Sequence, residues 1–505
     1  MWQRFSWYDV RVVGHYLGVL VLFSSVALLC PLVVAIAFQE WIPASHYLLS
    51  IGITLIVGSL LRLMRVQPGR LNRQQALVVT GLAWIVLAFM ASIPLWMSGH
   101  FATYLDALFD GVSGVTTTGV SIISDLDHLS YADNMWRFTI HALGGLGLVV
   151  VALSFGLFGK GSGASMFVSE GRSEHVVPNV VQTAQFISKL TAGFVAVATV
   201  VLSVMCFFDG MEAPRAFLNG LWLAISGFCT GGFTPMSNSV LYYHSYGIEF
   251  VLMLLMIVGS VNFVLHARLW RGRVEEFFND FEIRTMFIWI AVMTLVFAAS
   301  VSASSEFSNL ATMMRRGVFM VLSAFSTTGF QNITTNQLNT ALTSGAFLVL
   351  AALMAVGGGA GSTSGGIKFS RIGIILKSIV ATVKETISPD SARVVVSYNH
   401  VGRRILTPDV VKEAMTVFVL YVVTYGIGTL VGIAHGYEAT QAIFDSVAMA
   451  SNGGITSGVC TQGMPVTLEL FYMLEMWAGR LEFLTLIALV VKIVVSLNPR
   501  KLMGK

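Results

Sequence analysis

Residues 109–119 read FDGVSGVTTTG, and three later segments of the chain follow the same pattern without a gap. They are WLAISGFCTGG at 222–232, FMVLSAFSTTG at 319–329 and FDSVAMASNGG at 444–454. Each segment has an aromatic residue ten positions before its last glycine and a small residue six positions before it. The segments recur at intervals of 97 to 125 residues, which indicates four tandem repeats of one structural unit.

The chain around these segments has the composition of a membrane protein. Its 505 residues are 55% hydrophobic and only 11% charged, whereas a soluble domain carries roughly 25% charged residues. This excludes a soluble globular enzyme, a disordered chain and a nucleic-acid binder with a basic patch. Runs without Lys, Arg, Asp or Glu predict an all-α polytopic membrane fold with about ten spanning helices. These runs cover residues 12–39, 41–61, 74–105, 138–159, 190–208, 216–248, 250–267, 285–305, 317–367 and 414–437.

The charges are distributed unequally between the two sides of the membrane. If both termini lie on one side, 25 Lys and Arg residues lie there with them. The other side then keeps only Arg137, Arg215, Arg315 and Arg316, and the remaining cation, Arg480, falls within the last span beside Glu482. Because cytoplasmic loops carry an excess of Lys and Arg, this predicts that both termini are cytoplasmic.

The four repeated segments are too short to cross the bilayer, since each has only about ten apolar residues before its polar end. They are therefore expected to enter from outside, stop at mid-membrane and return as extended chain. Non-helical backbone at that depth must line a cavity or be buried in protein. Four helix C-termini around one axis would direct partial negative charge at the centre. Four sets of carbonyl oxygens could replace the water of a cation there, which predicts a pore. A single TTTG or STTG would be ordinary helix packing or capping, but four gapless copies favour the pore.

On these motifs the chain resembles the TrkH/TrkG/KtrB family of potassium-transporting membrane subunits. The resemblance runs from about residue 74 to 505 and implies four helix–pore-helix–helix units around one pore. The two spans within 12–61 resemble the extra N-terminal pair of the TrkH branch. We expect boundaries at 1–73 for that pair and at 74–184, 185–283, 284–408 and 409–505 for the four repeats.

The resemblance also implies a selectivity filter in which four glycines follow the carbonyl donors. All four positions are Gly, which favours potassium over sodium, whereas Cys229 and Asn452 depart from strict symmetry and make the sites less uniform. The implied potassium-binding residues are Thr116, Thr117, Thr118, Gly119, Cys229, Thr230, Gly231, Gly232, Ser326, Thr327, Thr328, Gly329, Ser451, Asn452, Gly453 and Gly454.

A glycine-rich run interrupts the second spanning helix of the third repeat. Six glycines lie within residues 357–366, and because each costs about 1 kcal/mol relative to Ala in a helix, the helix should break there. A phosphate-binding loop is excluded because Lys368 follows Ile367 rather than glycine. The run is either a kink or a flexible flap below the filter, and the resemblance implies a loop that gates the pore. The candidate gate comprises Gly357, Gly358, Gly359, Gly361, Ser362, Thr363, Ser364, Gly365, Gly366 and Arg480.

Arg480 is costly at mid-membrane, about 2.5 kcal/mol or more, so it should face a cavity or a partner. One interpretation is a structural salt bridge; the other, which we favour, places it beside the glycine-rich loop, where it resists cations. Glu482 points to another helix face and is a poor partner. Lys368 is expected to snorkel to the interface. Asp125, Asp127 and Asp133 either contribute to an acidic outer vestibule that concentrates cations or are ordinary solvated loop residues.

The sequence therefore predicts potassium uptake through the inner membrane of a bacterium, driven by the membrane potential, with potassium as the transported ion and no cofactor. The resemblance implies a homodimer with a cytosolic nucleotide-binding ring of the TrkA type, since the cytoplasmic loops are too short for a nucleotide domain. One alternative is a sodium- or proton-coupled potassium symporter. A more distant alternative is an integral-membrane enzyme. It would need catalytic side chains that converge, whereas His15, His141 and His266 are scattered over separate helices.

Overall fold

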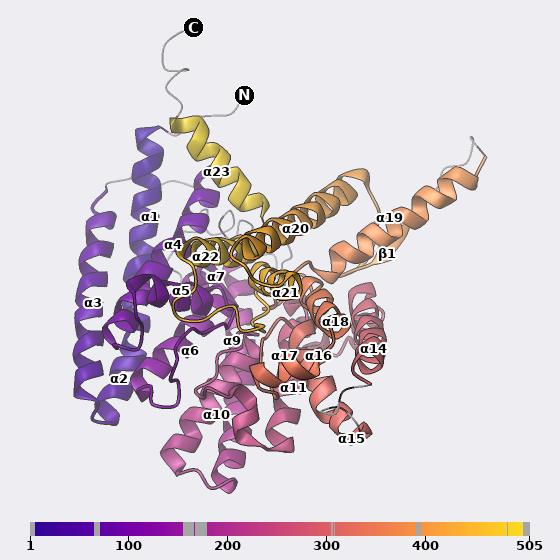
Figure 1. Ribbon diagram of the computed structural model, residues 1–505. Coiled ribbons are helices and arrows are strands. Elements are labelled where there is room, and N and C mark those ends of the chain that lie inside the picture. The colour runs from indigo at the N-terminus through magenta and orange to yellow at the C-terminus, as the bar shows by residue number, and fades with distance from the viewer. Residues whose placement is uncertain are drawn as a thin grey trace. The chain divides into compact units, whose positions relative to one another are not determined.

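The structure, a computed structural model, describes residues 6–64, 71–154, 166, 179–302, 304, 307, 309–389, 395–481 and 483–497. These residues form helices and one two-stranded hairpin, and several of the helices are long and apolar enough to cross a membrane. The all-helical membrane fold predicted from the sequence is thus confirmed (Figure 1). The chain divides into two compact units, one of residues 1–115, 128–190 and 481–505 and the other of residues 116–127 and 191–480. Glu482 and the basic segment 167–178 lie outside the described residues.

The first unit contains the two N-terminal spans and most of the first repeat. Its N-terminal helix begins at a capping box, in which the side chains of Ser6 and Asp9 each bind the other residue's backbone N–H. The helices of this unit are α1 (Trp7–Ala27), α2 (Leu29–Ala37), α3 (Trp41–Arg62), α4 (Arg73–Met97), α5 (Tyr104–Val115), α6 (Tyr131–Leu146), α7 (Leu148–Ser154) and α23 (Leu484–Leu497). Helix α9 (Val180–Phe208) begins in this unit and continues into the second.

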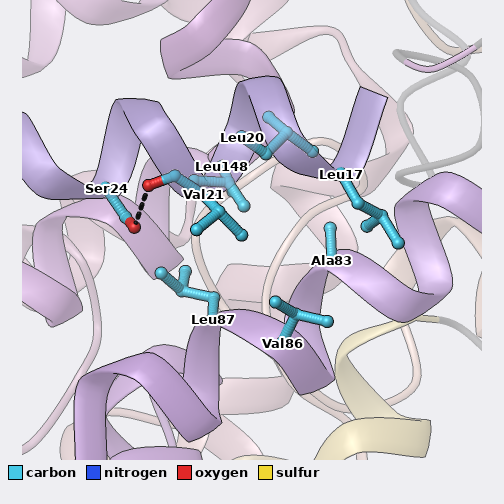
Figure 2. A pocket seen from close by; sticks show the side chains of 8 residues that line it. All are labelled: Leu17, Leu20, Val21, Ser24, Ala83, Val86, Leu87 and Leu148. Carbon is cyan, nitrogen blue, oxygen red and sulfur yellow. Dashed lines mark hydrogen bonds between the residues drawn. The ribbon is translucent and has the colours of Figure 1, made fainter. Parts of the chain in front are cut away.

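A small cavity lies where α1 packs on α4 and α7 in the first unit (Figure 2). Its only polar side chain is Ser24, whose hydroxyl donates to the carbonyl oxygen of Val21 in its own helix at 2.7 Å. The other lining residues are Leu17, Leu20, Val21, Ala83, Val86, Leu87 and Leu148. With an apolar wall and a satisfied hydroxyl, the cavity offers nothing that could replace a cation's water, so it is a gap in packing rather than an ion site.

The second unit contains the other three repeats together with the end of the first. It also holds the hairpin, whose strands pair in antiparallel register with Tyr398 opposite Arg404. Its elements after α9 are α10 (Ala213–Phe228), η1 (Ser239–Tyr243), α11 (Tyr246–Ser260), α12 (Phe263–Trp270), α13 (Val274–Phe278), α14 (Phe281–Val301), α15 (Leu310–Thr312), η3 (Met313–Gly317), α16 (Val318–Phe325), α17 (Thr335–Ala341), α18 (Ser344–Ala355), α19 (Phe369–Ile387), β1 (Ser397–Asn399), β2 (Arg403–Ile405), α20 (Pro408–Ala434), α21 (Ala439–Ala450) and α22 (Val466–Arg480).

Each repeat consists of a long first helix, a short helix and a second helix that is broken. The first helices α4, α9, α14 and α20 are continuous and apolar enough to span a membrane. The short helices α5, α10, α16 and α21 carry the four repeated segments. The second helices are the pairs α6 and α7, α11 and α12, α18 and α19, and α22 and α23. Among the described residues, six helices are long and apolar enough to cross a membrane, or seven if the bent pair α11 and α12 is one span, whereas the sequence predicts about ten spans.

The breaks in the second helices differ from the continuous spans expected at 138–159 and 250–267. In the first repeat, Gly147 has φ 87° and ends α6, because a left-handed residue cannot continue the helix. In the second, α11 and α12 meet at 103°, and the side chain of Asn262 caps α12 by accepting from the N–H of Val264 at 2.8 Å. In the third, residues 356–368 separate the two halves, so the glycine-rich run occupies a break that every repeat has.

Candidate functional site

The candidate filter segments begin where the four short helices end. In three repeats, the first residue in the left-handed conformation is Thr230, Thr327 or Asn452, with φ between 49° and 53°. The next N–H then bonds back to the carbonyl five residues earlier: Gly231 to Ser226 at 2.8 Å, Thr328 to Ser323 at 3.0 Å and Gly453 to Ala448 at 2.7 Å. This is the Schellman ending of a helix, and it usually takes glycine at the left-handed position. Asparagine tolerates this position, but threonine is β-branched and rarely adopts the conformation, so Thr230 and Thr327 are strained.

The first repeat has the same backbone signs, with Thr117 at φ 56° and Gly119 at φ 86°. In every repeat the left-handed residue is followed, two positions later, by a glycine that is left-handed too. The residue between them does not share this sign, so the peptide planes alternate along the segment. Alternation of this kind allows successive carbonyl oxygens to face the same side, an arrangement that could coordinate a cation.

The four last glycines and their neighbours close a ring within the second unit. A Cβ added to Gly119 would overlap the carbonyl oxygen of Gly231, and one added to Gly232 would overlap that of Thr328. A Cβ on Gly329 would come within 2.7 Å of the Cα of Gly454. The ring closes because a Cβ on Gly454 would overlap the carbonyl oxygen of Thr118. The last glycine of each repeat is therefore required for two reasons: its positive φ, and the close approach of the next repeat's backbone.

The side chains of the segments differ between repeats in the way they are bonded. The first and third repeats each have a hydroxyl pair, Thr116 with Thr118 at 2.8 Å and Ser326 with Thr328 at 2.6 Å. In the fourth repeat, the amide of Asn452 donates to the hydroxyl of Thr118 at 2.9 Å and to a backbone carbonyl of α22 at 3.0 Å. The departure at Asn452 thus ties the fourth segment to the first. Cys229, the corresponding residue of the second repeat, is buried and offers only a weakly polar thiol.

The glycine-rich loop, residues 356–368, contacts three of the four candidate filter segments. The N–H of Gly365 donates to the hydroxyl of Thr327 at 2.7 Å in the third segment, and a Cβ on Gly365 would overlap the carbonyl oxygen of Ser451 in the fourth. The hydroxyl of Thr363 lies 3.2 Å from that of Thr230 in the second. The loop is also largely buried, so it packs directly against the candidate filter.

The six glycines of the loop are needed for two different reasons. Gly358, Gly361 and Gly366 have φ of 31°, 64° and 68°, where other residues are strained. The other three have ordinary φ values but lie against other atoms: a Cβ on Gly357 would come within 2.5 Å of a side-chain carbon of Thr327, and one on Gly359 within 3.2 Å of the carbonyl oxygen of Ser260. The loop is therefore a specified structure, held by particular contacts, rather than a slack kink.

Two positively charged side chains, those of Arg480 and Lys368, donate hydrogen bonds to carbonyl oxygens of the loop. The guanidinium of Arg480, at the end of α22, donates to the carbonyl oxygen of Thr363 at 2.9 Å. The buried ammonium of Lys368 donates to the carbonyl oxygens of Ser364 and, at 3.4 Å, of Gly365. Sequence reasoning expected Lys368 to snorkel to the interface, and that expectation was wrong, because carbonyls three and four residues earlier fold back onto its side chain. Arg480 lies beside the loop, where the sequence placed it.

Polar side chains that the sequence did not single out support the candidate filter from behind. Asp445 in α21 accepts from the N–H and the hydroxyl of Ser457, both at 2.8 Å, and so fixes the chain that follows the fourth segment. The chain that follows the third segment is held in a similar way, because the amide of Asn332 donates to the carboxylate of buried Glu249 at 3.2 Å. The same carboxylate accepts from Arg315 through bonds of 2.6 to 3.1 Å. Asp445 stands nine positions before its glycine, and a search for acids at fixed offsets in the repeats could have found it.

In the first unit, Asp110 occupies the position in its repeat that Asp445 has in the fourth. It forms a fully buried ion pair of 3.4 Å with Arg137, which the charge count had assigned to the outer side. Of the expected vestibule acids, Asp125 and Asp127 are exposed. Asp133 is buried and binds the hydroxyls of Tyr47 and Ser130, both at 2.7 Å, so it belongs to the start of α6 rather than to a vestibule.

The sequence model of the TrkH family, described as a cation transport protein, matches residues 45–498. The chain belongs to the TrkH family. Among its relatives is an uncharacterized cation transporter of Methanocaldococcus jannaschii, 29% identical over 95% of both chains. The Trk system potassium uptake proteins TrkH of Halomonas elongata and TrkG of Escherichia coli are 28% and 27% identical over 95% of this chain and 98% and 97% of theirs. These matches confirm the family resemblance drawn from the repeats.

The fold of this TrkH family member is similar to a solved structure. The crystal structure of the potassium transporter TrkH from Vibrio parahaemolyticus matches with a TM-score of 0.80, at 23% sequence identity, over 95% of this chain and 98% of that one. The chain is thus a multi-pass membrane protein of a cation-transporting family, and the ring of glycines lies within the region that the family model covers.

Proposed function

We propose that this chain takes up potassium across the bacterial inner membrane through the four-repeat ring, with residues 357–366 and Arg480 as the gate. The observation that carries the proposal is the closed ring of four glycines, in which each glycine faces a backbone atom of the next repeat. Relatives named as potassium uptake proteins support potassium as the substrate. Carbonyl oxygens of such a ring would replace the ion's hydration shell.

In this proposal the membrane potential drives entry. A cytoplasm that is negative by 100 mV contributes about 2.3 kcal/mol for each potassium ion that enters. The loop lies against three segments of the ring and would block the cytoplasmic exit until it moves. Arg480, bonded to Thr363, adds a positive charge at the same level and raises the barrier for a cation.

The test is potassium uptake by a transport-deficient bacterium that carries this gene, with and without a co-expressed ring protein of the TrkA type. Growth at low potassium is expected with the gene and not with a control in which Gly232 and Gly329 are both replaced by Ser. In proteoliposomes, a reversal potential that follows the potassium gradient alone supports the channel-like mechanism. A reversal potential that also shifts with the sodium or proton gradient would replace it with coupled symport.

We further propose that the subunit works as a homodimer with both termini in the cytoplasm, where the nucleotide-binding ring would contact it. The positive-inside distribution supports this orientation. Reporter fusions at each terminus test it, and the mass of the purified complex in detergent tests the dimer. A periplasmic reporter signal, or a monomeric mass under conditions that preserve transport, would contradict these two parts of the proposal.

A further inference from the structure

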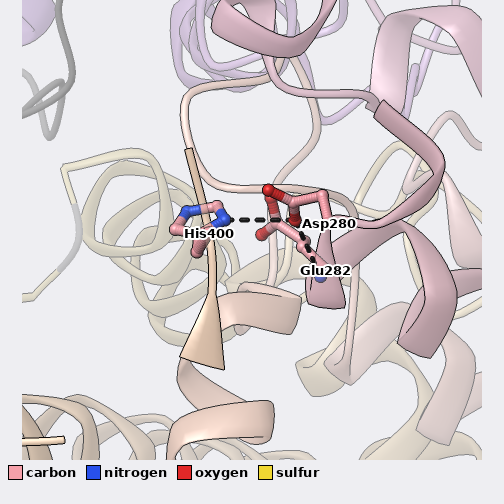
Figure 3. Close-up of side chains that lie close together, drawn as sticks. All are labelled: Asp280, Glu282 and His400. Carbon is pink, nitrogen blue, oxygen red and sulfur yellow. Dashed lines mark hydrogen bonds and ion pairs between the residues drawn. The ribbon is translucent and has the colours of Figure 1, made fainter. Parts of the chain in front are cut away.

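The first turn of α14 joins two parts of the second unit that are far apart in sequence. Asp280 caps the helix, since its Oδ1 accepts from the N–H of Glu282 at 2.9 Å. The same carboxylate binds the turn of the β1–β2 hairpin: Oδ2 accepts from the N–H of Val401 at 2.9 Å, and Oδ1 lies 3.3 Å from Nδ1 of His400. Figure 3 shows the Asp280 and His400 side chains facing each other beside Glu282.

The carboxylate of Glu282, two residues further on, points to the glycine-rich loop. Its Oε1 accepts from the N–H of Ala360 at 2.8 Å and from the N–H of Ser370, in the first turn of α19, at 3.1 Å. The side chain is 1% exposed. A buried carboxylate that accepts from backbone N–H groups makes strong, charge-assisted bonds, so this contact is a firm attachment of the loop.

Phe281, between the two acids, completes the junction. Its ring packs edge-on against Tyr398 at 5.2 Å and against His400 at 5.4 Å between centroids. A Cβ on Gly373 of α19 would overlap the same ring. Residues 280–282 thus hold the hairpin on one side and the loop on the other. Helix α19 starts at this junction, packs on α14 and α20, and its C-terminal end projects beyond α20 (Figure 1).

We propose that Glu282 is a positioning residue that holds the loop against the candidate filter and that, with Asp280, it couples the loop to the hairpin. A force on the hairpin or α19 would then reach Ala360 through one helical turn. This inference rests on the proposed function, because it takes the loop as the gate. It adds the attachment point and the cytoplasmic element through which a partner would act.

The three side chains also have the chemistry of a divalent-cation site, since a ligand atom from each lies within 4.8 Å of those of the other two. Three of the four carboxylate oxygens, however, already accept from backbone N–H groups, at Glu282, Val401, Ala360 and Ser370. Hydrogen bonds of this kind satisfy these three buried oxygens without an ion. The arrangement therefore favours a mechanical junction over a metal centre.

The test measures basal potassium flux in proteoliposomes without the partner. Glu282→Ala is expected to raise flux about tenfold, since a lost hydrogen bond to a charged group shifts an equilibrium by at least that factor. Glu282→Gln should raise it less, because an amide oxygen still accepts. Glu276→Ala is the matched control: it lies on α13, is partly exposed and pairs with Arg268 and Arg273, so its flux should equal that of the wild type.

Asp280→Asn separates coupling from folding. Asn caps a helix as well as Asp, so α14 should keep its start while the bond to Val401 is lost. Flux should rise as in Glu282→Ala, and the double variant should exceed neither single variant. Wild-type flux in Asp280→Asn would overturn the coupling, and wild-type flux in Glu282→Ala would overturn the attachment.

A second readout does not depend on transport. Hydrogen exchange of residues 356–368 should be faster in Asp280→Asn than in the wild type, and unchanged exchange would overturn the coupling even if a Glu282 variant fails to fold. If deletion of the loop also leaves flux unchanged, the proposed gate fails rather than the junction. Adding ZnCl₂ distinguishes the metal centre: a rise in wild-type melting temperature that is lost in His400→Ala would overturn the mechanical junction.

Discussion

The guanidinium of Arg480 lies 2.9 Å from the carbonyl oxygen of Thr363, and that bond joins the last spanning helix of the fourth repeat to the glycine-rich loop of the third. The hydroxyl of the same threonine lies 3.0 Å from the carbonyl oxygen of Phe228 and 3.2 Å from the hydroxyl of Thr230. Thr363 therefore contacts both the guanidinium of Arg480 and the second candidate filter segment. A movement of the loop that breaks one contact would disturb the other.

Arg480→Ala should increase basal flux. A unit charge a few ångström from the ion path contributes roughly 4 kcal/mol at an effective dielectric constant of about 20, so an increase of tenfold or more is expected. Arg480→Lys keeps the charge and can donate one bond to the carbonyl of Thr363, and its flux should stay near the wild-type value. Potassium flux into liposomes measures both variants. If the two variants behave alike, the charge does not oppose ions and Arg480 is structural.

Deletion of residues 358–364 should also raise basal flux, because it removes the contacts of Gly359, Ala360 and Thr363 while leaving the four filter segments intact. The ratio of potassium to sodium permeability is expected to stay at the wild-type value, since the ring is untouched. Bi-ionic flux measurements report both quantities. A folded deletion variant that conducts no faster than the wild type would contradict the gate.

The four repeats could be predicted from the sequence because the structure that requires the pattern is local. A short helix that ends in a left-handed residue needs small or polar side chains at fixed offsets, and four copies of that requirement form a pattern. The glycine-rich break was readable for the same reason. The breaks at Gly147 and Asn262 were not, because one glycine or asparagine in an apolar run is compatible with a continuous helix.

The supporting contacts could not be predicted, because their partners are distant in sequence or their geometry depends on the fold. Glu282 and Ala360 are 78 residues apart, and Glu249 and Arg315 are 66 apart. Lys368 was misread because its acceptors are backbone carbonyls, which every residue has. A sequence cannot tell which carbonyls turn toward an ammonium until the loop conformation is known.

Asp445→Ala should destabilise the protein. The change leaves the N–H and hydroxyl of Ser457 without their acceptor, which costs about 2 kcal/mol for buried groups. Asp445→Asn should cost less, because its amide oxygen still accepts from the N–H and the serine hydroxyl can reorient. Melting temperatures in detergent compare the two, with exposed Asp127→Asn as the control. Equal melting temperatures for Asp445→Ala and the wild type would show that this carboxylate does not support the fourth segment.

Gly119→Ser should raise sodium permeation relative to potassium. The new Cβ would overlap the carbonyl oxygen of Gly231 and would occupy a backbone with φ 86°, a conformation that costs about 1–2 kcal/mol for residues other than glycine. The first and second segments must separate, which displaces carbonyl oxygens that would coordinate the ion. A displacement worth about 1.4 kcal/mol changes relative site affinities about tenfold.

Gly210→Ser is the matched control for this substitution. Gly210 has φ 95°, and no heavy atom outside its chain neighbours lies within 4 Å of an added Cβ. This variant therefore has the same kind of backbone strain as Gly119→Ser but does not crowd a neighbour. Its permeability ratio should equal that of the wild type, whereas Gly232→Ser, which crowds the carbonyl of Thr328, should behave like Gly119→Ser. Bi-ionic potentials across proteoliposome membranes measure the ratio. If Gly119→Ser folds and retains the wild-type ratio, Gly119 does not line the ion path and the ring is not the filter.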